Sequence, residues 1–163
     1  MKEMKNPMIV IFGLVMLLTG SLACKTDDLT ITDRNMETNR STQTDTLSNQ
    51  IKVRIGSRTF TATLLNNATV TAFKAKLPMT VSMSELNGNE KLYRFQENLP
   101  TDASNPGNIN SGDLMIYGSN TLVLFYQSFP TSYSYTKLGR IEDAAGLAAA
   151  VGSGSVAVSF VLD

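Results

Sequence analysis

The amino-acid sequence predicts a mainly β protein, with residues 49–163 forming a closed, eight-stranded barrel that carries two short helices. Short runs of alternating apolar and polar residues indicate roughly eight strands, and turn residues separate these runs. Hydrophobic residues make up 42% of the chain, which is enough for a sizeable core. Closure of the sheet is the expected arrangement because a barrel leaves no strand edge exposed.

The first part of the domain has the pattern of a hairpin followed by a helix. Residues 51–55 and 60–64 alternate apolar and polar side chains, as half-buried strands do, and a Gly-Ser pair supplies the turn between them. Asn66 and Asn67 offer a cap for a short amphipathic helix, which Pro78 ends. The apolar side of this helix holds Val70, Phe73 and Leu77.

The later elements have shorter patterns. A second helix is expected over the alanine-rich residues 143–151, where Gly152 and Gly154 end it. The polar residues 100–111, which include two prolines, predict a surface loop at the rim of a site. Further strands are expected at residues 91–96, 114–117, 121–127, 136–142 and 155–162.

The composition excludes several classes of site. The formal net charge is zero, so the chain lacks the positive charge that nucleic-acid binding requires. Histidine is absent, which removes the commonest metal ligand, the usual general base near neutral pH and the middle member of a Ser–His–Asp triad. The single cysteine allows neither an intrachain disulfide nor a cysteine-rich zinc site. We therefore expect no metal, no cofactor and no nucleic-acid partner.

Residues 1–23 have the three parts of an export signal. Lys2 and Lys5 place positive charge at the start, residues 8–18 are almost wholly apolar, and the small residues 19–23 precede Cys24. The apolar run of about 11 residues is too short to cross a bilayer core, which needs about 20. The segment is therefore predicted to be a signal peptide.

Cys24 stands at the predicted cleavage point. The arrangement resembles a bacterial lipobox, in which the cysteine is acylated and becomes the first residue of the mature protein. Ser21 occupies the place where the usual pattern has leucine, and Leu22 follows one step late. Ordinary cleavage beside an incidental cysteine is the alternative. Lys25 and the acidic pair after it resemble the surface-export tag of Bacteroidetes lipoproteins, and this resemblance implies a lipid anchor in the bacterial cell envelope, at the outer membrane on its periplasmic or surface face.

Residues 24–48 are expected to be a disordered tether between the lipid and the domain. They are rich in Thr, Asp, Asn, Ser and Gln, and they contain no aromatic residue. Such a segment cannot bury enough apolar surface to offset the entropy lost on ordering. The predicted organisation is a lipoprotein signal peptide over 1–23, the tether over 24–48 and one folded domain over 49–163.

An ordered set of short strings, rather than one motif, runs through the folded part of the chain. These strings are residues 51–56, 60–64, 72–78, 89–91, 111–118, 122–126, 131–136 and 138–141. Together they resemble the bacterial cyclophilin-like domain family over about residues 49–163. The resemblance implies an eight-stranded barrel plugged by a helix at each end.

Cyclophilins proper are peptidyl-prolyl isomerases, and the resemblance implies which residues would correspond to their site. Arg94 falls where the catalytic arginine is expected, and Phe125 or Tyr126 matches an aromatic position of a later strand. The segment that should hold a tryptophan and a histidine offers only Tyr133 and Tyr135. The glutamine motif expected before Gly112 is also missing. The candidate cleft residues are Arg94, Gln96, Phe125, Tyr126, Tyr133 and Tyr135.

The leading hypothesis is a module that binds a peptide or small molecule and lacks the full prolyl-isomerase set. A weak isomerase that assists the folding of envelope proteins is the first alternative, with Arg94 as its catalytic residue. A role in flavodoxin-linked redox biology is the second. Simple structural roles compete with each site assignment: a solvated strand position for Arg94, core packing for Phe125 and Tyr126, local packing for the other tyrosines, and a turn acceptor for Asp113.

Overall fold

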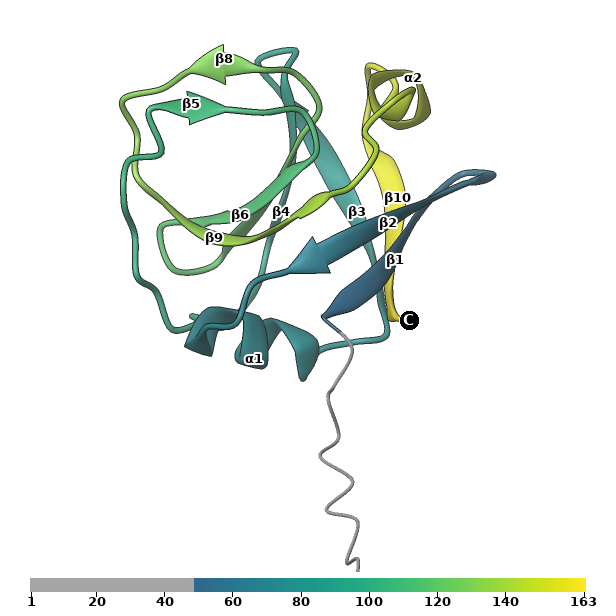
Figure 1. Cartoon of the computed structure of the whole chain (residues 1–163). Coiled ribbons are helices and arrows are strands. Elements are labelled where there is room, and N and C mark those ends of the chain that lie inside the picture. The colour runs from purple at the N-terminus through teal and green to yellow at the C-terminus, as the bar shows by residue number, and fades with distance from the viewer. Residues whose placement is uncertain (1–48) are drawn as a thin grey trace, which may run out of the picture. The chain divides into compact units, whose positions relative to one another are not determined.

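The computed structural model describes residues 49–163, and Figure 1 shows their arrangement. Cys24, the predicted signal peptide and the predicted tether lie outside the described residues. No helix within residues 49–163 is long and apolar enough to cross a membrane.

Eight antiparallel strands close into a barrel in the order β1-β10-β3-β4-β7-β6-β9-β2 (Figure 1). This arrangement confirms the predicted mainly β class and the closed barrel. The β1–β2 hairpin was also predicted correctly, with Val53 paired to Phe60. The strands are β1 (Gln50–Ile55), β2 (Arg58–Leu64), β3 (Met79–Leu86), β4 (Glu90–Arg94), β6 (Asp113–Tyr117), β7 (Thr121–Phe125), β9 (Tyr135–Ile141) and β10 (Val156–Leu162).

The two helices lie at opposite ends of the barrel (Figure 1). α1 (Ala68–Lys74) begins at the predicted cap, where the Asn67 side chain accepts a hydrogen bond from the Val70 amide at 2.8 Å. Its Phe73 is fully buried, and the ring packs edge-on against Phe160 with centroids 5.8 Å apart. This end of the barrel is therefore closed by apolar side chains.

The second helix, α2 (Leu147–Val151), is shorter than the predicted 143–151. The Asp143 side chain accepts a hydrogen bond from the Ala145 amide, which makes a turn instead of a helical start. Gly146 then has a φ of 77°, so a regular helix begins only after it. Leu147 and Val151 are buried in the main core.

The barrel has apolar clusters on both sides of one wall. Leu122 and Leu124 of β7 belong to the main core inside the barrel. Because successive side chains of a strand point to opposite faces, Val123 and Phe125 point outward. They join a second cluster with Ile109, Met115, Tyr135 and Phe129.

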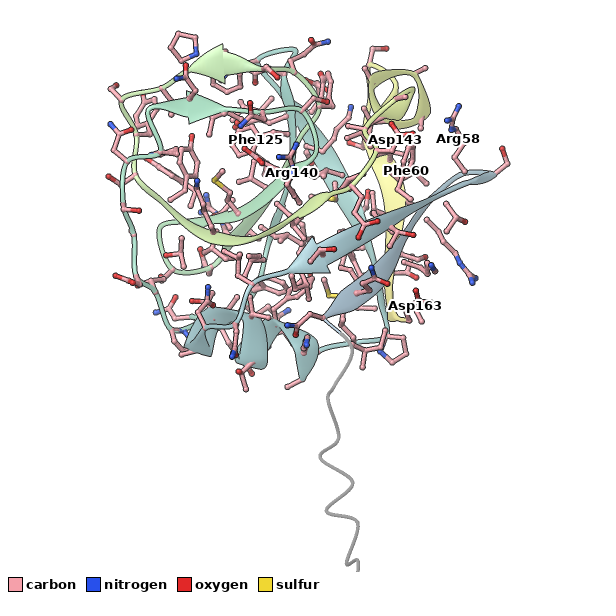
Figure 2. All side chains as sticks on the ribbon, viewed as in Figure 1. Arg58, Phe60, Phe125, Arg140, Asp143 and Asp163 are labelled. Carbon is pink, nitrogen blue, oxygen red and sulfur yellow. The ribbon has the colours of Figure 1, made fainter. Side chains whose placement is uncertain are left out.

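The second cluster is covered by a separate two-stranded sheet made of β5 (Asn108–Ile109) and β8 (Phe129–Pro130). Figure 2 labels Phe125 on this side of the molecule. The sequence did not predict β5, β8 or β3. Two predicted strands also end earlier than expected, at Arg94 rather than residue 96 and at Phe125 rather than residue 127.

Candidate functional site

A pocket of about 300 Å³ lies on the outer face of the barrel wall formed by β4 and β7. The turn between β3 and β4 bounds it at one end, and residues from β6, β8 and β9 complete its wall. We call this pocket the outer cleft. The second apolar cluster sets its position, because the aromatic residues Phe129 and Tyr135 of that cluster form one side of the cleft.

Strand β4 supplies the floor of the outer cleft through alternate residues. Glu90, Leu92 and Arg94 all line it, whereas Lys91 between them is fully buried and pairs with Leu124 of the main core. Four residues of a strand span about 13 Å. Glu90 and Arg94 therefore place opposite charges at the two ends of one pocket.

Aromatic rings form one wall of the outer cleft. Tyr117, Tyr133 and Tyr135 line it, and Tyr117 lies 6.1 Å from Tyr133 and 5.5 Å from Tyr135, measured between ring centroids. Tyr133 is 62% exposed and Tyr117 46% exposed, so both rings remain open to a ligand. Phe125 packs edge-on beneath Tyr135 with centroids 5.5 Å apart, which fixes the wall from below.

The two charged ends of the cleft differ in their surroundings. Arg94 is exposed, and none of the described residues forms a hydrogen bond or ion pair with its guanidinium. Glu90 is only 9% exposed. Burial raises the pKa of its carboxyl, and the neighbouring negative charge of Glu85 raises it further. Burial also raises the pKa of the Tyr135 hydroxyl, with a smaller contribution from Glu90.

Residues 53–161 match the model of the cyclophilin-like family. The chain belongs to this family. The cyclophilin-like domain also resembles the solution structure of a hypothetical protein from Archaeoglobus fulgidus, with a TM-score of 0.55 and 18% sequence identity. That likeness covers 72% of this chain and 96% of the archaeal chain, and it concerns the fold. No curated protein matches the sequence.

The cyclophilin-like domain brings some of the candidate residues together. Arg94, Tyr133 and Tyr135 line the outer cleft. Phe125 is fully buried directly beneath it, in contact with Tyr135 and Phe129. The exposed Gln96 follows the end of β4 and does not line the cleft.

Tyr126 points to the other side of the wall. Its hydroxyl donates a hydrogen bond to the Glu85 carboxylate at 2.8 Å, and its ring belongs to the main core. Burial and, to a smaller extent, the hydrogen bond to Glu85 together raise the pKa of this hydroxyl to about 12. Asp113 holds a turn, since its carboxylate accepts a hydrogen bond from the Asn110 amide at 2.8 Å. The turn-acceptor interpretation of Asp113 is therefore confirmed.

Residues that the sequence did not single out complete the outer cleft. The polar ones that matter most are Glu90, Asn89 and Tyr117. The available signal was the spacing of Glu90 and Arg94, which puts both on the same face of a strand. The spacing predicts a shared site only when the inner and outer faces of β4 are known, because the period of a strand does not show which of its faces points into the barrel.

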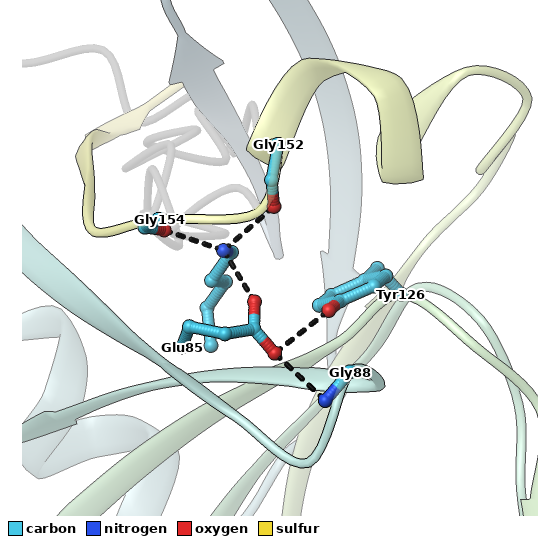
Figure 3. A network of polar contacts seen from close by, with 6 residues as sticks. Glu85, Gly88, Tyr126, Gly152 and Gly154 are labelled. Carbon is cyan, nitrogen blue, oxygen red and sulfur yellow. Dashed lines mark hydrogen bonds and ion pairs between the residues drawn. The ribbon is translucent and has the colours of Figure 1, made fainter.

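A buried polar network lies behind the β3–β4 turn (Figure 3). The Lys91 ammonium donates to Glu85 at 2.5 Å and to the carbonyls of Gly152 and Gly154 at 2.8 and 2.6 Å. The other Glu85 oxygen accepts a hydrogen bond from the Gly88 amide at 2.9 Å. The network thus fixes the turn that bounds the outer cleft.

A second hollow of about 250 Å³ lies beside Arg58 and Asp143, which Figure 2 labels at the far end of the β1–β2 hairpin. The Arg58 side chain already has partners within the protein at this hollow. Its guanidinium donates to the Ala145 carbonyl at 3.2 Å and lies 5.4 Å from the centre of the Phe60 ring. Residues 49–163 contain no group of three or more cysteine or carboxylate side chains that could hold a metal ion.

Proposed function

We propose that the cyclophilin-like domain is a binding module that takes a peptide or small molecule into the outer cleft. One observation carries this proposal: Arg94, without a partner among the described residues, shares a pocket with three tyrosine rings. A guanidinium forms strong hydrogen bonds to carboxylate and carbonyl groups. Tyrosine rings add contact area and lose little conformational entropy on binding.

The size of the outer cleft supports a small occupant. Its volume of about 300 Å³ lies at the lower end of small-ligand pockets, which hold about 300–1,000 Å³. Leu92, Val123 and Phe129 supply apolar lining between the polar ends. This combination of apolar walls and a few polar groups is typical of sites that fix a ligand in one orientation.

Nuclear magnetic resonance tests the proposal directly. Isotope-labelled protein is titrated with a library of short peptides, and the backbone signals of Leu92, Val123 and Tyr135 are expected to shift. Arg94→Ala should remove these shifts. Arg54→Ala is the matched control, because Arg54 is an exposed arginine on β1 outside the cleft. Shifts that persist in Arg94→Ala, or that map elsewhere, contradict the proposal.

Weak prolyl-isomerase activity is the second candidate, favoured by the position of Arg94 beside the apolar Val123 and Phe129. Isomerisation requires stabilising a twisted amide against a barrier of about 18–20 kcal/mol. The chain has no tryptophan or histidine to complete the site of cyclophilins proper. A protease-coupled assay on a proline peptide tests the idea. Turnover that disappears in Arg94→Ala and persists in Arg54→Ala would favour the enzyme over the pure binding module.

We further propose that Cys24 anchors the protein by lipid to the bacterial envelope. The proposal is supported by the sequence pattern alone, since Cys24 lies outside the described residues. Growth of expressing bacteria with an alkyne-tagged fatty acid should label the wild-type protein, and Cys24→Ser should remain unlabelled. Protease treatment of whole cells then distinguishes a surface-facing protein from a periplasmic one. Equal labelling of both proteins would overturn the lipid anchor.

A further inference from the structure

Two side-chain acceptors at the β3–β4 end of the outer cleft have no hydrogen-bond partner among the described residues. The Asn89 Oδ1 atom is buried and unpaired. The adjacent Glu90 is nine-tenths buried and makes no side-chain hydrogen bond within residues 49–163. Both residues line the cleft. A buried polar atom without a partner costs about 1–3 kcal/mol, and more if charged, so such atoms are normally satisfied by a ligand or an ordered water.

We propose that this end of the outer cleft is a subsite for an ammonium group, held by Glu90 and Asn89. The inference rests on the proposed binding function and names the chemistry of the ligand. A carboxylate and an amide oxygen are both acceptors, so the occupant must donate hydrogen bonds. A neutral donor would satisfy Asn89 but would leave the buried Glu90 charge without compensation.

The aromatic wall supports the same occupant. Tyr135 lines the cleft together with Glu90, and the electrostatic effect of Glu90 reaches its hydroxyl. Aromatic rings attract cations through their negatively polarised faces. An ammonium group at this end would therefore share the pocket with both a carboxylate and an aromatic ring, whereas a ligand anion would be repelled by Glu90.

The opposite end determines which ammonium compounds fit. Arg94 lies four residues along β4, about 13 Å from Glu90 between Cα atoms, with both side chains reaching into one pocket. An extended tripeptide spans about 10 Å. Its N-terminal ammonium can lie at Glu90 while its C-terminal carboxylate lies at Arg94. A free amine shares only the first of these contacts, so the two sources of an ammonium group are separable.

Calorimetric titration of the purified protein with four probes tests the subsite. The probes are trialanine, N-acetyl-trialanine, trialanine amide and n-butylammonium chloride. Acetylation is expected to weaken binding at least about tenfold, which corresponds to 1.4 kcal/mol. Glu90→Gln should weaken the binding of trialanine by a similar factor, and the variant should bind the free and the acetylated peptide equally well. Glu97→Gln is the control, because the Glu97 side chain is 79% exposed and lies outside the cleft.

The outcomes separate this inference from the proposed function. Equal binding of free and acetylated peptide, still lost in Arg94→Ala, overturns the ammonium subsite and leaves the binding module intact. Absence of binding by both trialanine and n-butylammonium overturns the subsite, and absence of any hit from the peptide library overturns the binding module as well. Binding of n-butylammonium that depends on Glu90 supports the subsite with a free amine as source. Binding of trialanine alone supports it with a peptide N-terminus.

Discussion

The Lys91 ammonium lies 2.5 Å from the Glu85 carboxylate, and this ion pair joins two residues that face each other across the neighbouring strands β4 and β3. Lys91 is fully buried and also binds the two carbonyls of the loop after α2. Glu85 binds the Gly88 amide in the β3–β4 turn. The pair therefore holds the end of the barrel and one edge of the outer cleft in a fixed relation.

Removing the charge of Glu85 should destabilise the domain. Glu85→Gln leaves the buried Lys91 ammonium without its carboxylate, and breaking a buried pair costs about 3–5 kcal/mol. The side chain of Glu85 is 24% exposed, so we expect a loss just below this range, about 2–3 kcal/mol. Urea unfolding measures the change. Glu97→Gln, which breaks the exposed pair with Lys76, should cost less than about 1 kcal/mol.

The pH dependence of the same variant gives an independent check. Burial raises the pKa of Glu85, but the hydrogen bonds from Lys91 and Tyr126 outweigh it, so the folded-state pKa lies below the ordinary 4.5. The stabilisation is therefore present above pH 4.5 and is lost as the pH falls through the lowered pKa. The difference in the free energy of unfolding between wild type and Glu85→Gln should become smaller in acid. A difference that stays constant with pH would contradict an ionic contribution.

The carboxylate of Glu90 should affect stability in the opposite direction from that of Glu85. Its folded-state pKa lies above 4.5, because burial and the Glu85 charge disfavour the carboxylate. The ionised group therefore costs stability at neutral pH, and the cost disappears below pH 4.5. Glu90→Gln should unfold at a higher temperature than wild type at pH 7 and at the same temperature in acid. Lower stability of the variant at pH 7 would contradict this prediction.

Binding of an ammonium ligand should follow the same titration. The charged or titratable groups around Glu90 are Glu85 behind the turn, Arg94 at the far end of the cleft, and the hydroxyls of four tyrosines, Tyr117, Tyr126, Tyr133 and Tyr135. Only the two glutamates titrate in mild acid, and Glu85 does so at lower pH. Trialanine affinity should therefore fall as the pH drops through the raised pKa of Glu90, and in Glu90→Gln it should not change over that range.

Much of the fold was predictable from local patterns. The alternation of apolar and polar side chains in residues 51–55 and 60–64 predicted the first hairpin, and Asn67 predicted the start of α1. Strand β3 was missed although Val81 and Met83 alternate with serines, because the pattern directly follows the helix-ending Pro78. The pairing of β5 with β8 involves two residues on each side, which is too short for any periodicity.

The site was less predictable because a strand's period does not identify its inner face. Phe125 and Tyr126 were equal candidates in the sequence, and the fold separates them. Phe125 supports the outer cleft, while Tyr126 binds Glu85 on the inner side. Glu90 gained importance only from its burial and from the pocket that it shares with Phe129 of β8 and Tyr135 of β9, which are distant in sequence.

Gly139 should tolerate no side chain. A Cβ at this position of β9 would lie 2.2 Å from the Thr63 carbonyl oxygen and 2.8 Å from the Leu64 Cα of β2. Since backbone atoms cannot move aside cheaply, Gly139→Ala should cost about 1–3 kcal/mol or more. Gly154→Ala is the control, because its Cβ meets nothing within 4 Å and its carbonyl still accepts from Lys91. Urea unfolding that finds both variants equally stable would contradict the close strand contact.

Two tyrosine variants should separate ligand binding from stability. Tyr133→Ala removes a 62% exposed ring from the cleft wall. Peptide affinity should fall roughly threefold to tenfold, because an aromatic contact is worth about 1 kcal/mol. The midpoint of urea unfolding should stay unchanged, since the exposed ring adds little to the core. Tyr126→Phe removes the hydroxyl that binds the Glu85 carboxylate, so stability should fall by about 1.5–3 kcal/mol and the cleft should bind as before. Calorimetric titration and urea unfolding of both variants measure the two effects. A loss of affinity in Tyr126→Phe that exceeds the loss in Tyr133→Ala would place the ligand on the inner side of the wall and contradict the outer cleft.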